Sequence, residues 1–196
     1  MSQDISLNDL LSEIQERASG HGKYVIALSG FGGSGKSTLA DKIAEQLENT
    51  IIIHLDDFII DRLSKRSEDW ESFDWNRLTK QVLEPILEGT DVLEYGVYDW
   101  KENALTNIKK IVLKKYVIIE GIGLIRENLK KYFDLTVWLD VPLEIASRRG
   151  KQRDVEEYGL PHYAELWDSL WTPNDHDYFA KFQPDVHADF LLANQF

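Results

Sequence analysis

The chain has 196 residues, of which 43% are hydrophobic and 29% charged, and its formal net charge is -12. This length and apolar content predict one globular domain and exclude a disordered or fibrous chain. The absence of cysteine excludes a disulfide scaffold and a thiolate nucleophile. The acidic balance argues against a nucleic-acid partner or an anionic membrane surface, and no apolar run is long enough to span a bilayer. The N-terminal residues lack a signal-peptide pattern, so we expect a cytoplasmic location.

Apolar periodicity predicts strands and helices that alternate along the chain. The expected helices cover residues 6–18, 38–47, 75–87 and 142–157. The expected strands cover residues 24–28, 51–55, 92–98, 116–119, 135–139 and 188–193. Residues 61–72 are charged and poorly periodic, which favours a surface loop or lid. This alternation predicts a mainly parallel central sheet that helices cover on both faces, which is a three-layer α/β/α sandwich.

A glycine-rich segment joins the first expected strand to the next helix. Residues 30–37 read GFGGSGKS, which matches the GxxxxGK[ST] pattern of a phosphate-binding loop, or P-loop. Glycines let backbone N–H groups turn inward around a phosphate, and the following helix directs its positive end at the same anion. Lys36 would supply charge for the β- and γ-phosphates, and Ser37 a hydroxyl for Mg²⁺. The expected ATP-binding residues are Gly30, Gly32, Gly33, Ser34, Gly35, Lys36, Ser37 and Thr38.

The alternative is a glycine-rich turn with a solvated lysine, but strand, loop and helix agree in their expected order. The sequence therefore predicts binding of a nucleoside triphosphate.

Carboxylates follow two expected strands at the edge where the P-loop lies. Parallel strands place their C-terminal residues in one crevice. We expect Asp56 to be a general base or Mg²⁺ contact, with a capping or turn role as the alternative. Asp57 is the weaker candidate because adjacent strand residues point in opposite directions. Glu120 is expected to bind Mg²⁺ or its water, and Asp140 to cap the helix that follows it.

Two arginines lie four residues apart on the expected helix 142–157. This spacing puts Arg149 and Arg153 on one helical face. Their guanidinium groups could reach the γ-phosphate and neutralise its charge in the transition state. The alternative is a solvated basic face that pairs with nearby glutamates.

An ordered set of segments runs through most of the chain: GFGGSGKS, LDDF, FDWNRL, VYDW, IIEGI, RRGKQRD and PDVHADFLL. This set resembles the uridine kinase-like branch of P-loop kinases, whose relatives include pantothenate kinase and phosphoribulokinase. The resemblance implies ATP-dependent phosphorylation of a small-molecule hydroxyl, which is the ribose 5′-OH in the nucleoside case. It also implies the three-layer α/β/α sandwich of P-loop NTPases, with a mainly parallel central sheet and a helical lid, and Mg²⁺ as cofactor. We expect a single kinase domain over residues 1–196, with an N-terminal helix in 1–20 and lid and flanking helices in about 142–180.

The resemblance assigns roles residue by residue. The implied catalytic residues are Lys36, Asp56, Arg149 and Arg153. The implied metal ligands are Ser37, Asp56 and Glu120. On the acceptor side, Asp74 would hydrogen-bond sugar hydroxyls, and Tyr98 and Trp100 would stack on an acceptor base.

The departures from the family pattern fall on the acceptor side. Ile59 stands where uridine kinases typically have Tyr, and the KEN stretch around Asn103 replaces a His that reads the pyrimidine. Residues 158–160 read YGL where relatives have the R-G-R end of the lid. The phosphoryl-transfer residues all match.

We therefore expect an ATP-dependent kinase of a small hydroxyl compound, with a uridine- or cytidine-like nucleoside as first candidate. The alternatives are a non-nucleoside acceptor, pantothenate-like or a sugar, and a nucleotide-binding regulatory switch. The chain has no N/T-K-x-D segment that would read guanine. The histidines lack metal-site spacing, and Trp167 and Trp171 are expected to pack in the core or lid. A homo-oligomer is compatible with the sequence, which does not specify the oligomeric state.

Overall fold

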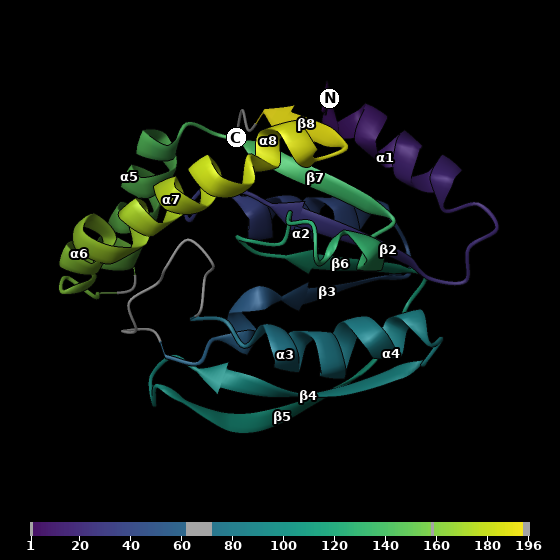
Figure 1. The fold of residues 1–196 in the computed structure, drawn as a ribbon, viewed down its shortest axis with the longest axis horizontal. Coiled ribbons are helices and arrows are strands. Elements are labelled where there is room, and N and C mark those ends of the chain that lie inside the picture. Colours follow the sequence, from purple (N-terminus) through teal and green to yellow (C-terminus); the bar gives the residue numbers. More distant parts are fainter. Residues whose placement is uncertain (1, 62–71, 158, 194–196) are drawn as a thin grey trace.

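The central feature of the molecule is a six-stranded sheet, in which all neighbouring strands are parallel (Figure 1). The computed structural model describes residues 2–61, 72–157 and 159–193. The strand order is β1 (Gln3–Asp4), β8 (Phe190–Ala193), β7 (Leu135–Asp140), β2 (Tyr24–Ser29), β6 (Tyr116–Glu120) and β3 (Thr50–His54). The fold is therefore the expected α/β fold. The pairing of β1 with β8 places the first and last strands of the described chain side by side.

The middle of the sheet is fully buried. Every residue of β2 and of β6 is buried, as expected for parallel strands that are covered on both faces. The strands pair in register, with Leu28 opposite Glu120 on one side and His54 opposite Glu120 on the other. This register places the polar strand ends side by side next to the P-loop.

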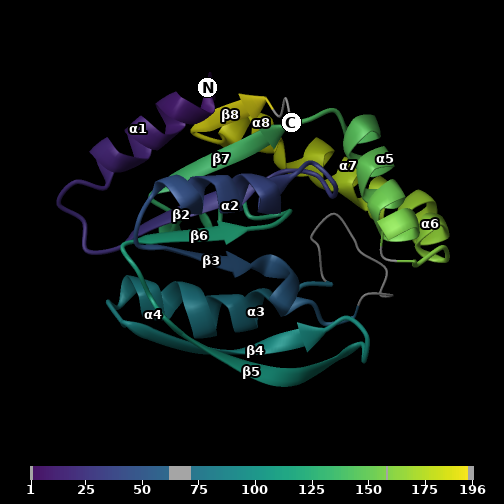
Figure 2. The same cartoon turned by 180° about the vertical axis from the view of Figure 1, so that it is seen from behind.

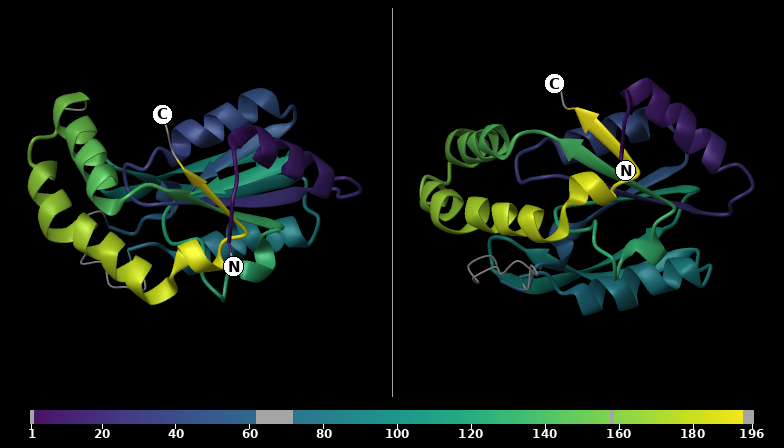
Figure 3. Two further views of the ribbon diagram at one scale, coloured as in Figure 1. Left: turned by 90° about the horizontal axis from the view of Figure 1, so that it is seen from above. Right: turned by 45° about the horizontal axis from the view of Figure 1, so that its top comes forward.

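Helices cover both faces of the sheet, and Figures 2 and 3 show α2 on the face opposite to α7 and α8. The α-helices are α1 (Leu7–Arg17), α2 (Lys36–Gln46), α3 (Trp75–Leu78), α4 (Glu84–Leu87), α5 (Leu143–Gln152), α6 (Tyr163–Leu166), α7 (Thr172–Phe182) and α8 (Pro184–His187). Short 3₁₀ turns are η1 (Leu55–Phe58) and η3 (Lys130–Tyr132), and π-helical turns are η2 (Thr79–Leu83), η4 (Arg153–Glu157) and η5 (Trp167–Trp171).

The helices follow the predicted apolar periodicity. In α1, the Ser6 hydroxyl accepts a hydrogen bond from the Asp9 amide, and Leu10, Leu11 and Ile14 form the buried face. The helix expected over 75–87 is continuous through α3, η2 and α4, and that expected over 142–157 is α5 followed by η4. The capping role expected for Asp140 is wrong, since no side chain caps α5.

A two-stranded antiparallel sheet, β4 (Val92–Asp99) and β5 (Ala104–Val112), lies beyond α3 and α4 (Figure 1). The sequence predicted β4 and missed β5. Seven of the nine residues of β5 are exposed, which explains the absence of a buried apolar run. The loop or lid expected at 61–72 lies almost wholly outside the described residues.

No helix among the described residues has the length and apolar character needed to cross a bilayer.

Candidate active site

The P-loop connects β2 to α2 and needs glycine at its tightest point. Gly33 has φ of 78°, in the left-handed region, and an added Cβ would lie 2.2 Å from the carbonyl oxygen of Ala146. Gly35 has φ of 96° and is the N-cap of α2, which begins at Lys36. The loop therefore fits closely against α5, and only glycine permits both the turn and the contact.

The P-loop side chains point toward the expected metal site. The Lys36 Nζ donates a hydrogen bond to the carbonyl oxygen of Phe31 at 2.9 Å. The Ser37 hydroxyl donates to Glu120 Oε1 at 3.1 Å. Lys36, Ser37 and Glu120 also line one cavity, so the structure brings these three predicted residues together.

Glu120 is buried, and His54 on the neighbouring strand holds its carboxylate. The distance from His54 Nδ1 to Glu120 Oε1 is 2.7 Å. Burial by itself would raise the pKa of Glu120, but the His54 hydrogen bond and the Lys36 charge hold it below its usual value. The same hydrogen bond raises the pKa of His54. Sequence analysis missed His54, although its place at a strand end beside LDDF was a usable signal.

Asp56 and Asp57 face different surroundings. Both lie in η1 rather than in a strand, so the argument from alternating strand directions does not apply to them. Asp56 lines the cavity. Asp57 faces the hairpin formed by β4 and β5, where its Oδ2 lies 3.6 Å from Lys109 Nζ. Burial raises the pKa of Tyr95, and the charge of Asp57 raises it further. Asp56 is therefore the carboxylate placed to act in the cavity.

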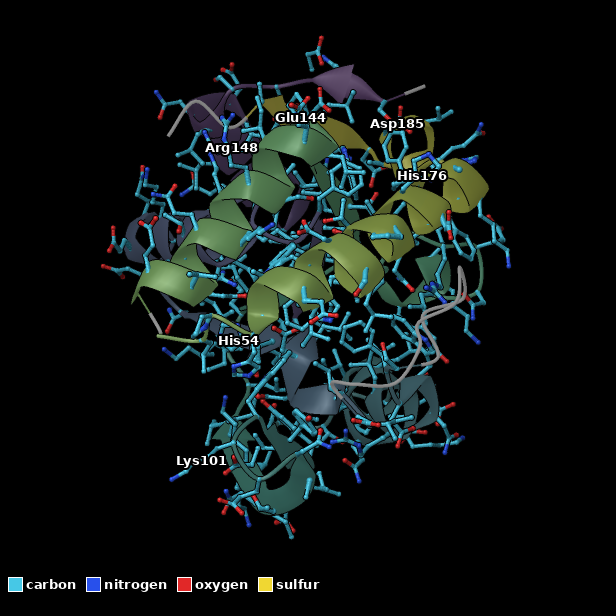
Figure 4. All side chains as sticks on the ribbon, turned by 90° about the vertical axis from the view of Figure 1, so that its left-hand side faces the viewer. His54, Lys101, Glu144, Arg148, His176 and Asp185 are labelled. Atoms are coloured by element: carbon cyan, nitrogen blue, oxygen red, sulfur yellow. The ribbon has the colours of Figure 1, made fainter. Side chains whose placement is uncertain are left out.

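The cavity has a volume of about 440 Å³ and lies at the end of the sheet where β3 and β6 stop. Figure 4 looks onto this end and shows His54 between the helices α5 and α7 and the hairpin tip at Lys101. The lining residues are Gly32, Gly33, Lys36, Ser37, Asp56, Phe73, Trp100, Glu120, Gly121, Ile122, Arg153, Asp154, Leu160, Tyr163, Trp167, Trp171 and Asp175. One wall is thus the P-loop with the carboxylates, and the other is largely aromatic.

The aromatic wall comes from the lid segment, which we define as η4, α6, η5 and the first turn of α7. Tyr163, Trp167 and Trp171 form a separate buried cluster. The ring centroids of Trp167 and Trp171 are 5.2 Å apart in an edge-to-face arrangement. The packing role predicted for the two tryptophans is confirmed, and both also line the cavity.

Arg149 and Arg153, the two arginines expected to act from the lid, lie in different environments. Arg153 lines the cavity, and its Nη2 lies 2.8 Å from Asp154 Oδ1. Asp154 in turn accepts a hydrogen bond from Trp167 Nε1 at 2.8 Å. Arg149 is exposed and does not line the cavity. Of the pair, the structure brings Arg153 alone into the site.

Of the three residues expected to bind the acceptor, Trp100 lines the cavity, whereas Tyr98 and Asp74 do not. Trp100 lines the cavity and packs on the lid cluster. Tyr98 is buried, and its hydroxyl donates to Asn103. Asp74 caps α3 by accepting a hydrogen bond from the Arg77 amide at 2.8 Å, and it does not line the cavity.

Arg77 is a further buried residue that sequence analysis did not single out. Its guanidinium donates to the carbonyl oxygens of Asp57 at 3.0 Å and Gly96 at 2.5 Å. It also lies over the Phe58 ring, 4.9 Å from the centroid. Arg77 therefore ties η1, which carries Asp56, to the hairpin.

The donor set suits a magnesium–nucleotide complex. Mg²⁺ is usually held by one or two carboxylates, phosphate oxygens and waters. Ser37 and Glu120 are in contact and Asp56 lines the same cavity, so oxygen ligands of the right kind are present. In the part of the chain that the structure describes, no three His, Cys, Asp or Glu side chains gather as a metal cage of protein ligands alone.

Comparison with known proteins defines the class. The profile of the Phosphoribulokinase / Uridine kinase family matches residues 25–188, and the chain belongs to this family. The chain is 28% identical over 178 residues to a uridine kinase of Borrelia duttonii, covering 86% of this chain and 85% of that protein. It is 29% identical over 182 residues to a uridine kinase of Ligilactobacillus salivarius, covering 86% and 84%.

Solved structures confirm the fold. A protein from Bacillus stearothermophilus, described as a possible uridine kinase, superposes with a TM-score of 0.69 at 21% identity, covering 95% of this chain and 98% of that chain. A D-glycerate 3-kinase from Cryptococcus neoformans superposes with a TM-score of 0.65 at 12% identity, covering 95% of each. Membership of the Phosphoribulokinase / Uridine kinase family makes the protein a P-loop kinase, and the family implies ATP as phosphoryl donor.

Proposed function

We propose that the protein transfers the γ-phosphoryl group of ATP to a hydroxyl of a small molecule, most simply the ribose 5′-OH of a uridine- or cytidine-like nucleoside. One observation carries this proposal: the P-loop lysine, the Ser37–Glu120 pair and Asp56 line one cavity of about 440 Å³, which an aromatic wall bounds. The relatives named uridine kinase support the nucleoside as first candidate.

Each residue has a role in this reaction. The P-loop amides and Lys36 would hold the triphosphate, and Ser37, Asp56 and Glu120 would supply oxygen ligands to Mg²⁺. Bound Mg²⁺ would neutralise charge on the phosphate oxygens. Asp56 would accept the proton of the attacking hydroxyl, and Arg153 would stabilise the charge that develops on the transferring group. Arg149 would join it only if the lid closed further.

A non-nucleoside acceptor is the second candidate, and a specific observation favours it. Asn103, at the position where uridine kinases read the base, accepts a hydrogen bond from Tyr98. Ile59, which replaces the family's Tyr, is buried in the core. Neither side chain lines the cavity, so base reading would depend on Trp100 and the lid cluster.

The test is acceptor dependence of ADP formation. Purified protein with Mg²⁺ and ATP should form ADP much faster when its correct acceptor is present, across a panel of nucleosides, sugars and pantothenate-like compounds. The product should carry the phosphate on a hydroxyl, as phosphorus NMR can show. Equal ATP turnover with every compound would contradict the kinase proposal and favour a nucleotide-operated switch.

We further propose that residues 1–196 act as one kinase domain in the cytoplasm, with a lid and flanking helices in about 142–180. The sheet and its flanking helices share one hydrophobic core cluster, which supports the single domain. Limited proteolysis should then release no stable fragment that retains nucleotide binding.

A further inference from the structure

One carboxylate of the lid segment lies against the P-loop itself. Asp175, on α7, accepts a hydrogen bond from the backbone N–H of Gly32, with 2.8 Å between Gly32 N and Asp175 Oδ2. Asp175 is only 2% exposed, and both residues line the cavity. An anionic oxygen of the protein thus meets a loop whose backbone amides are suited to phosphate oxygens.

The contact is held from several sides. A Cβ added to Gly32 would lie 2.8 Å from the ring of Trp167 and 3.4 Å from Asp175 Oδ2. Trp167 is fixed by its hydrogen bond to Asp154. Because η5 continues directly into α7, Asp175 and the tryptophan cluster belong to one helical segment. A displacement of Asp175 therefore involves the aromatic wall.

The P-loop backbone and its lysine hold the β- and γ-phosphates in P-loop NTPases, and we take the γ-phosphate to lie at Gly32. It and Asp175 then cannot both occupy this part of the loop. A carboxylate oxygen and a phosphate oxygen compete for the same N–H donor, and their negative charges repel each other in a partly buried site. The diphosphate of ADP lacks the third phosphoryl group and leaves the carboxylate with less competition.

We propose that Asp175 is a specificity-determining residue of the nucleotide site, which weakens binding of a nucleoside triphosphate relative to the diphosphate until α7 moves. This inference rests on the proposed function, since it takes the P-loop to be the ATP site. Seating of the γ-phosphate then requires a shift of the helix that carries the aromatic wall. The acceptor pocket and the triphosphate site are coupled in this way.

The test is Asp175→Asn, which keeps the shape and an acceptor oxygen for Gly32 but removes the charge. Affinities for the Mg²⁺ complexes of ADP and of a non-hydrolysable ATP analogue are measured by calorimetry. The analogue should bind about tenfold more tightly to the variant, and the affinity for ADP should stay within about twofold. Asp177→Asn, on the same helix but 60% exposed at its side chain, should leave both affinities unchanged. Figure 4 shows the neighbouring His176 on the outer side of α7.

Unchanged or weaker binding of the ATP analogue by Asp175→Asn would overturn the inference, and so would an equal gain for both nucleotides. Should the variant fail to fold, hydrogen exchange of the wild-type protein decides the matter. The analogue, but not ADP, should then increase exchange in the first turns of α7, and equal exchange with both nucleotides would refute the inference. If the wild-type protein binds neither nucleotide, the proposed function falls with it. Nucleotide binding without an effect of Asp175 would refute this inference alone.

Discussion

The two sides of the cavity are built from different materials. On the nucleotide side, the phosphate-binding groups come from eight consecutive residues, 30–37, between a buried strand and a helix. On the acceptor side, Trp100 from the hairpin meets Trp167 and Trp171 from the lid segment, some 70 residues further along the chain. The P-loop binds through backbone N–H groups, so its conformation is specified by a short stretch of sequence. The aromatic wall consists of side chains from distant elements, so it depends on how these elements pack.

The chemistry differs in the same way. The nucleotide side is a polar network around Glu120. The Glu120 carboxylate is hydrogen-bonded to Ser37 and to His54, and the charge of Lys36 helps to lower its pKa. Among the described residues, the acceptor side is mostly aromatic. We expect changes on the first side to affect turnover, and changes on the second to affect the choice and binding of the acceptor.

The largest effect is expected for Lys36→Ala. Loss of the cation that meets the β- and γ-phosphates should lower acceptor-dependent ADP formation by about 10³-fold. Lys114→Ala, at an exposed position between β5 and β6, is the matched control and should be active. Near wild-type rates for Lys36→Ala would remove the P-loop from the mechanism.

Asp56→Asn should lower kcat by about 10²-fold, because the amide cannot accept the proton of the hydroxyl. Affinity for the ATP analogue should change little. Asp57→Asn should be milder, since Asp57 faces Lys109 rather than the cavity. Steady-state kinetics of both variants decide between them, and a greater loss of kcat for Asp57→Asn would show that the base is misassigned.

Variants at Asp74 distinguish a role in stability from a role in acceptor binding. The family resemblance assigns Asp74 to the acceptor hydroxyls, although it does not line the cavity. On that role, Asp74→Ala should raise the KM for the acceptor about tenfold and leave the KM for ATP nearly unchanged. It should also lower the free energy of unfolding by about 1 kcal/mol, since it removes the cap of α3. Asp74→Asn keeps a good cap residue, so it should retain stability. If its acceptor KM is also normal, Asp74 is a structural residue and does not bind the acceptor.

The smallest effect concerns the His54–Glu120 pair and is measured without nucleotide or Mg²⁺. The pKa of His54 is raised from 6.5, so its contribution to stability is complete below pH 6.5 and is lost as pH rises through the higher folded value. The pKa of Glu120 is lowered from 4.5, so its contribution is complete above pH 4.5 and is lost as pH falls.

The stability difference between wild type and His54→Gln should therefore be greatest between about pH 4.5 and 6.5. Urea unfolding over a pH series measures it, with His187→Gln, an exposed position, as control. A difference that is independent of pH would mean that the pair is not ionised in the folded protein.

The fold was predictable where local signals are strong. Buried runs such as those of β2 and β6 are apolar because both faces of the sheet are covered, and this reads directly from sequence. β5 was missed because its residues are mostly exposed and its position is fixed only by pairing with β4. Asp56 and Asp57 were compared as if they continued the side-chain alternation of the strand predicted over residues 51–55, whereas both lie in a 3₁₀ turn.

The sequence by itself determined the P-loop, the order of strands and helices, and the presence of carboxylates at strand ends, because each depends on neighbouring residues and on the period of the backbone. The tertiary structure alone decided that His54 holds Glu120, that Arg153 rather than Arg149 reaches the cavity, and that Asp175 meets Gly32. These contacts join residues up to 143 positions apart. Their geometry follows from packing of whole elements, which no local pattern encodes.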